Sequence, residues 1–129
     1  MPWDFDNSKP IYIQLVEELK LRVISGQLAA GSKLDSVRDL AEEAGVNPNT
    51  MQRALAELER EQLVYSQRTS GRFVTQDMEL IKVMRNQYAT TKIKEVTVAL
   101  LQLGYTKEEL LKLIEEDLKA QEEKQTQYV

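Results

Sequence analysis

Residues 31–59 read GSKLDSVRDLAEEAGVNPNTMQRALAELE, and this stretch carries the signals of two short helices separated by a tight turn. Ser36 is a suitable N-cap for the first helix, because its hydroxyl can accept a hydrogen bond from a backbone N–H of the first turn. Gly45 is expected to end that helix, and Asn47 to cap the next one. Pro48 then occupies the first helical position, where its missing N–H has no intrahelical partner. Two short helices joined by a turn that contains glycine predict a helix-turn-helix.

The second of these helices, expected from about Pro48 to Glu61, has one apolar face and one polar face. Its apolar face consists of Met51, Ala54, Leu55 and Leu58. Its opposite stripe consists of Asn49, Gln52, Arg53 and Ala56. A helix in the major groove presents its N-terminal residues to base edges, and Asn and Gln side chains can bond adenine through two contacts. The stripe therefore indicates recognition of DNA bases, although helix capping alone is an alternative reason for Asn47 and Pro48.

The flanking segments complete a small domain. Upstream, apolar residues recur at helical spacing before Gly26, namely Ile11, Leu15, Leu19 and Val23. Downstream, LVYS (63–66) and RFVT (72–75) have the β-branched and aromatic composition of strands. The intervening QRTSG (67–71) predicts a hairpin tip that holds Arg68, Ser70 and Gly71. The expected fold is mainly α with a small β-hairpin, as a winged helix-turn-helix in residues 1–76.

Residues 77–129 predict a second region of two helices. A stretch without proline or glycine indicates one long helix up to Gly104, and Thr106 with Glu109 forms a capping box for a final helix. The apolar arc of these helices is too wide for a helix pair alone, which predicts pairing with a second copy of the chain. The expected interface residues are Met84, Tyr88, Val96, Leu100, Leu103, Leu110 and Ile114. The alternative is that this surface packs back on the winged helix.

Composition excludes several classes of protein. The chain has 129 residues, of which 42% are hydrophobic and 29% are charged, as in globular proteins. It has no cysteine and no histidine, which removes disulfides, the commonest general base and the commonest metal ligand. An enzyme, a cofactor or a metal site is therefore not expected. Neither a signal peptide nor an apolar run long enough to span a membrane is evident, so the expected location is the cytoplasm.

The net charge of −4 does not by itself indicate nucleic-acid binding. DNA binding must therefore depend on where the basic side chains lie. Arg38 lies in the first turn of the first short helix, Arg53 is on the polar stripe, and Arg68 and Arg72 flank the hairpin tip. In a winged helix these four arginines are expected to converge on one side. Glu59 is the acid that falls nearest to the exposed stripe.

Three segments that occur in order resemble the GntR family of bacterial transcription regulators. KPIYIQL (9–15) resembles the start of the family's first helix, residues 31–59 resemble its helix-turn-helix core, and QRTSGRFV (67–74) resembles its wing. The resemblance implies that DNA is contacted by Arg38, Asn49, Thr50, Gln52, Arg53 and Arg68. Ser36, Asn47, Ser70 and Gly71 complete the candidate DNA-binding set.

The short C-terminal region looks like that of the YtrA-type subfamily, in which two helices form a dimerisation device. The resemblance implies a dimeric repressor of a palindromic operator, often beside transporter genes. A small-molecule effector is left open, with a cleft near Trp3, Phe5 and Tyr12 as its suggested place. The alternative function is a winged helix that binds another protein and has no specific DNA activity.

Three residues depart from the family's pattern, in which proline is usual at Asp35 and glycine is usual at Gln62 and at Thr69. If the position of Gln62 needs a positive φ, glutamine there costs on the order of 1 kcal/mol. A wing that enters the minor groove closely favours a residue without a side chain at its tip, whereas this chain has Thr69 there.

Overall fold

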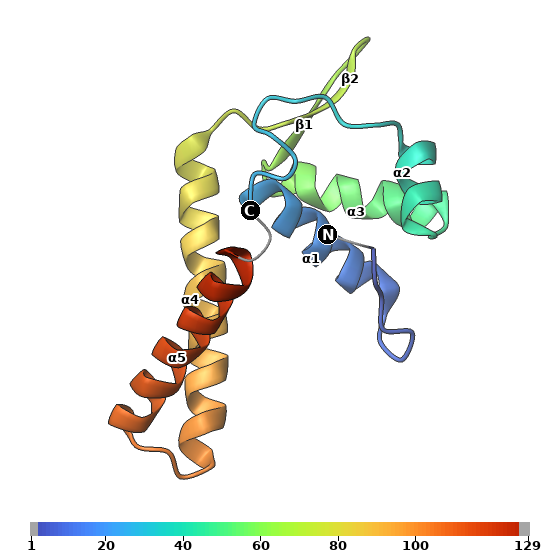
Figure 1. The fold of residues 1–129 in the computed structure, drawn as a ribbon. Helices are drawn as coiled ribbons and strands as arrows, with labels where there is room; N and C mark the ends of the chain where they lie inside the picture. The colour runs from blue at the N-terminus through green and yellow to red at the C-terminus, as the bar shows by residue number, and fades with distance from the viewer. Residues whose placement is uncertain (1–2, 127–129) are drawn as a thin grey trace. The chain divides into compact units, whose positions relative to one another are not determined.

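The structure is a computed structural model that describes residues 3–126. In this range the elements are α1 (Ile11–Ile24), α2 (Val37–Ala44), α3 (Pro48–Arg60), β1 (Val64–Gln67), β2 (Gly71–Val74), α4 (Met78–Gln102) and α5 (Lys107–Thr126), as Figure 1 shows. The predicted mainly helical fold with one hairpin after the helix-turn-helix is thus confirmed. The chain divides into two compact units, Met1–Asn86 and Gln87–Val129. No helix among the described residues is both long enough and apolar enough to cross a membrane.

The first unit is built around α3, which contacts α1, α2 and β1 (Figure 1). The predicted apolar face of α3 is fully buried, as are the central leucines of α1, Leu15 and Leu19. Strand residues Val64 and Val74 close the core from the hairpin side, and Ile81 in the early part of α4 joins the same cluster. Burial of these aliphatic side chains is the main source of stability for the unit. It also leaves the opposite side of α3 exposed to solvent.

Local capping residues set the two helices of the helix-turn-helix, as predicted. The Ser36 hydroxyl accepts a hydrogen bond from the Asp39 N–H at 3.1 Å. Gly45 adopts the left-handed conformation with a φ of 72° and ends α2. The side-chain oxygen of Asn47 accepts from the Asn49 N–H at 2.8 Å, and Pro48 opens α3. The turn is therefore fixed by residues that lie within it.

The C-terminal end of α3 has the hydrogen-bond pattern of a Schellman motif. The Gln62 N–H donates to the Glu59 carbonyl, and the Leu63 N–H donates to the Leu58 carbonyl, both at 3.0 Å. This motif requires a left-handed residue, which is commonly glycine. Gln62 adopts a φ of 67° and is the one non-glycine residue with positive φ in the described part of the chain. The expectation that glutamine replaces glycine at a position of positive φ is thus confirmed.

The hairpin is antiparallel, with Val64 opposite Val74 and Gln67 opposite Gly71. The predicted strand limits of 63–66 and 72–75 were each wrong by one residue. The extended segment before α2 adds a third partner, since the Leu34 N–H donates to the Arg72 carbonyl and the Val74 N–H donates to the Ser32 carbonyl, both at 2.9 Å. The segment that leads into α2 is therefore hydrogen-bonded to the wing.

Within the second unit, the turn between α4 and α5 follows the sequence prediction. Gly104 has a φ of 95°, and the capping box is formed in both directions between Thr106 and Glu109. Most large apolar side chains of this unit are exposed in the single chain, namely Ile93, Val96, Val98, Leu101, Leu103, Tyr105, Leu111, Leu113, Ile114 and Leu118.

Two residues of the expected interface differ from that pattern. Leu110 is buried in the single chain, with only 6% of its surface exposed. Met84 is partly buried against the core of the first unit. For Met84 the structure therefore agrees with the alternative in which part of the surface packs on the winged helix. Tyr88, with 40% of its surface exposed, and Leu100, which is half-buried, remain candidates for pairing.

Candidate nucleic-acid interface

The polar stripe of α3 is exposed as predicted. Asn49, Gln52 and Arg53 face solvent, while Thr50 is half-buried. Asn47 uses its side-chain oxygen to cap the helix, so capping accounts for this asparagine. Asn49 is the second residue of α3 and so lies in the first turn, the part of a major-groove helix that meets the bases. Capping therefore accounts for Asn47, while the exposed side chain of Asn49 stays a candidate for contacts with bases.

Arg53 is supported by the first helix. Its guanidinium carbon lies 4.5 Å from the centroid of the Tyr12 ring, a cation–π contact between α3 and α1. This contact leaves the hydrogen-bond donors of the guanidinium available, because the ring face accepts the charge rather than a particular N–H. Tyr12 therefore positions the Arg53 guanidinium on the polar stripe of α3.

Arg72, one of the four arginines expected to converge on one side, is engaged in contacts within the protein. Its Nε donates to the Glu59 Oε1 at 2.8 Å, and its Nη1 donates to the Gln52 Oε1 at 3.4 Å. The Ser66 hydroxyl donates to the same oxygen of Glu59. The hydrogen bond from Ser66, followed by that from Arg72, holds the pKa of Glu59 below its ordinary value. Glu59, the acid nearest the stripe, thus lies beside a cation that compensates its charge.

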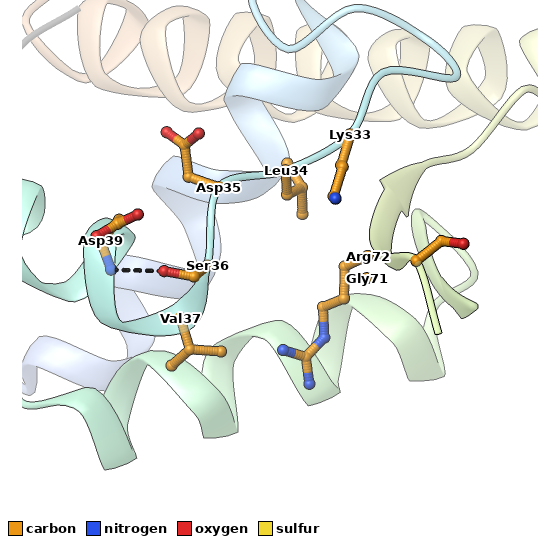
Figure 2. A pocket seen from close by; sticks show the side chains of 9 residues that line it. Lys33, Leu34, Asp35, Ser36, Val37, Asp39, Gly71 and Arg72 are labelled. Carbon is orange, nitrogen blue, oxygen red and sulfur yellow. Dashed lines mark hydrogen bonds between the residues drawn. The ribbon is translucent and has the colours of Figure 1, made fainter. Parts of the chain in front are cut away.

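A hollow of about 560 Å³ lies between the start of α2 and the hairpin, and Figure 2 shows its lining. Three residues of the candidate set, Ser36, Ser70 and Gly71, line it. Arg72 extends from β2 toward α3 in the same view, and Lys33 enters from the segment before α2. The hollow is therefore lined both by residues at the start of α2 and by residues of the wing.

Lys33 is a cation of this surface that the sequence analysis missed. It belongs to a short extended segment whose partner could not be read from the sequence, and a backbone bridge to Phe73 brings it to the wing. Gly71 is required here, because its φ is 106° and a Cβ atom would lie 3.1 Å from the Lys33 Cε. The lysine stem and the glycine therefore pack as a pair.

The electrostatics of the hollow are mixed. Asp35 and Asp39 line it together with the two cations. A phosphate group inside it would meet both carboxylates, so its floor is unsuited to an anion. Arg38 and Arg68 lie on exposed positions of α2 and of the hairpin tip, and neither forms an ion pair within residues 3–126. These two arginines, like Lys33 and Arg53, are therefore exposed cations that remain available to an external partner.

The aromatic side chains suggested for an effector cleft are used in packing. Trp3, Phe5 and Tyr12 all pack against the core of the first unit. The Trp3 indole N–H donates to the Glu43 carboxylate at 3.1 Å, and the Arg22 guanidinium lies 3.6 Å from the centroid of the indole ring. These contacts fasten the N-terminal segment to the winged helix and leave no observation in favour of a ligand there.

The chain is similar to known regulators over most of its length. The model of the family described as "Bacterial regulatory proteins, gntR family" matches residues 11–74. The regulator YhcF of Bacillus subtilis, an uncharacterized helix-turn-helix protein, is 36% identical over 107 residues, which cover 83% of this chain and 88% of that protein. The repressor YtrA of the same organism is 36% identical over 69% of this chain and 66% of its own length.

A solved structure agrees with these relatives. A GntR family transcriptional regulator from Listeria monocytogenes superimposes with a TM-score of 0.81 at 38% identity and covers 87% of this chain and 98% of that one. Both Bacillus subtilis relatives are named as transcription regulators, in agreement with the expectation that the chain is not an enzyme. The chain belongs to the GntR family of bacterial regulatory proteins and is a DNA-binding transcription regulator.

Proposed function

We propose that the protein is a dimeric repressor that binds a palindromic operator with α3 in the major groove. The observation that carries this proposal is the exposed stripe of Asn49, Gln52 and Arg53 on the helix whose other face forms the core. Arg38 and Arg68 lie on the neighbouring elements and are available for phosphate contacts, which position a protein on DNA. The similar repressor YtrA supports repression as the regulatory outcome.

Pairing of two chains is supported by the apolar side chains of the second unit. Leu103 has 73% of its surface exposed, and Leu111 and Leu118 each have 57% exposed. Large apolar side chains exposed in this number mark an interface more often than a solvated face. A two-fold dimer would present two recognition helices to two half-sites separated by about one turn of DNA or a multiple of it.

Selection of random DNA duplexes on the purified protein tests this proposal. The expected result is enrichment of a palindrome, with an affinity that falls as salt rises because phosphate contacts release counterions. Arg38→Ala should abolish specific binding without unfolding the protein. Arg85→Ala, which removes the same charge from an exposed position of α4, is the matched control and should bind normally. Normal operator affinity of the Arg38→Ala protein would refute the contact assignment.

A second candidate function is a winged helix that binds another protein, and the net charge of −4 favours it. Sequence-selective, salt-sensitive binding of a duplex would exclude it. Folded dimeric protein that enriches no sequence would support it. The regulated genes, which the family resemblance suggests to be transporter genes, would follow from a genome search with the selected operator.

A further inference from the structure

A chain of hydrogen bonds joins the wing to the reading face of α3. Ser66 on β1 and Arg72 on β2 both donate to the Glu59 carboxylate, and Arg72 continues to the side chain of Gln52. Glu59 and Gln52 lie seven residues apart on α3, so they share one face of the helix. Arg72 is largely buried, with only 20% of its side chain exposed. This chain of hydrogen bonds, called the bridge below, therefore holds the Arg72 guanidinium in one place beside the polar stripe of α3.

This bridge determines which atoms Gln52 can offer to a base. A glutamine amide has one acceptor oxygen and an NH₂ group with two donors. The oxygen of Gln52 is turned toward the Nη1 of Arg72, at 3.4 Å. The NH₂ group is therefore the part of the amide that remains for an outside partner. The guanidinium beside it adds N–H groups and no acceptor, so this part of the stripe presents hydrogen-bond donors.

The pattern of donors distinguishes the two purines. Adenine presents an acceptor, N7, and a donor, N6, in the major groove, and a glutamine needs both its oxygen and its NH₂ group to match them. Guanine presents two acceptors, N7 and O6. We propose that Arg72, held by Glu59 and Ser66, acts as a positioning residue that fixes Gln52 as a donor, so that Gln52 selects guanine rather than adenine. This inference rests on the proposed function, in which α3 reads the operator.

Asn49 provides the contrast within the same helix. Its backbone N–H bonds to the cap residue Asn47, but its side chain forms no hydrogen bond with any residue of the described chain. Its oxygen and its NH₂ group are both available for the two contacts of adenine. Adenine recognition thus stays the prediction for Asn49, whereas the prediction for Gln52 changes to guanine. One half-site should therefore contain a position for each purine, read by residues less than one helical turn apart.

The test is duplex selection with the full chain and three variants. Gln52→Ala identifies the operator position that Gln52 reads, because the base preference there is lost. Arg72→Ala frees the amide, and the preference at that position should move from guanine toward adenine by about fivefold or more, the lower end of the discrimination of a bidentate pair. Arg72→Lys keeps a stem and a charge for Glu59 and serves if the alanine variant does not fold. Arg60→Ala, which removes another arginine paired with a glutamate of α3, is the matched control and should leave the preference unchanged.

The outcomes separate this inference from the proposed function. Guanine at the position mapped by Gln52→Ala, with a shift toward adenine in both Arg72 variants, supports the inference. Adenine at that position in the unmodified protein, or an unchanged preference in the Arg72 variants, overturns it even though an operator has been selected. An effect of Arg72→Ala on overall affinity alone would also overturn it, because a merely structural arginine would not alter one base preference. Failure to enrich any operator would refute the proposed function itself.

Discussion

Replacing Gln62 with glycine should stabilise the protein by about 0.5–1 kcal/mol. Gln62 has a φ of 67° at the end of α3, and an L-residue in the left-handed conformation costs roughly 1–2 kcal/mol. Glycine removes this cost but loses about 0.4–1 kcal/mol through the greater freedom of the unfolded chain. The glutamine side chain is exposed, so its removal sacrifices little burial. The difference of the two terms is a net gain.

Urea denaturation of the unmodified protein, Gln62→Gly and Gln62→Ala, all at one protein concentration, measures this gain in the free energy of unfolding. The concentration must be fixed because the proposed dimerisation would make the free energy of unfolding depend on it. Gln62→Ala is the matched control, since alanine shortens the side chain yet keeps the strained φ, and it should lie close to the unmodified protein. A glycine variant no more stable than the alanine variant would show that the left-handed position carries no strain. The Schellman hydrogen bonds would then be formed without cost at this residue.

Four further substitutions test the helix cap, the polar stripe of α3, the Glu59 carboxylate and the exposed apolar side chains of the second unit. Asn47→Ala should lower the free energy of unfolding by about 1 kcal/mol through loss of the cap. Asn49→Ala should instead weaken operator binding with little effect on thermal unfolding. Equal effects of the two substitutions in both assays would show that helix capping and DNA binding are not divided between these two asparagines. The depressed pKa of Glu59 means that its carboxylate stabilises the fold at neutral pH and that this stabilisation is lost as the pH falls below about 4.5. The stability difference between the unmodified protein and Glu59→Gln, followed by denaturation against pH, should therefore shrink on acidification, and a constant difference would contradict the assignment. Leu103→Glu should shift sedimentation from dimer to monomer, and an unchanged dimer would place the interface elsewhere.

The order of helices could be predicted because its signals are local. Ser36, Gly45 and Asn47 each act on backbone groups within three residues, so their chemistry can be read from adjacent letters of the sequence. The buried face of α3 follows from spacing alone in the same way. The predicted limits of the two strands were less exact than those of the helices. A strand begins and ends where its backbone pairs with its partner, and the start of pairing at Val64 and at Gly71 cannot be read from composition.

The contacts between distant residues could not be predicted. Arg72 and Glu59 are thirteen residues apart, and their pairing depends on how the hairpin folds over α3. Lys33 reaches the wing through the pairing of its extended segment with β2. Arg72 and Arg68 cannot be distinguished from the sequence, since both flank the hairpin tip. In the structure Arg72 lies within an ion pair, whereas Arg68 is exposed at the tip. Which arginine is free is therefore a property of the tertiary structure.

The difference between arginines that are paired within the protein and arginines that are not explains how a chain with a net charge of −4 can bind DNA. In the winged helix several acids are paired internally, with Glu59 bound to Arg72, Glu57 to Arg60, Glu61 to Lys20 and Glu18 to Arg22. Within the described residues, Arg38 and Arg68 form no such pair, and exposed charges act mainly within a Debye length of about 8–10 Å at moderate salt. A phosphate beside either arginine is therefore governed by that arginine and its near neighbours rather than by the net charge. Because each winged helix supplies few such cations, a useful affinity would require two of them on one DNA, and this supports the proposed pairing of two chains through the exposed apolar side chains of the second unit.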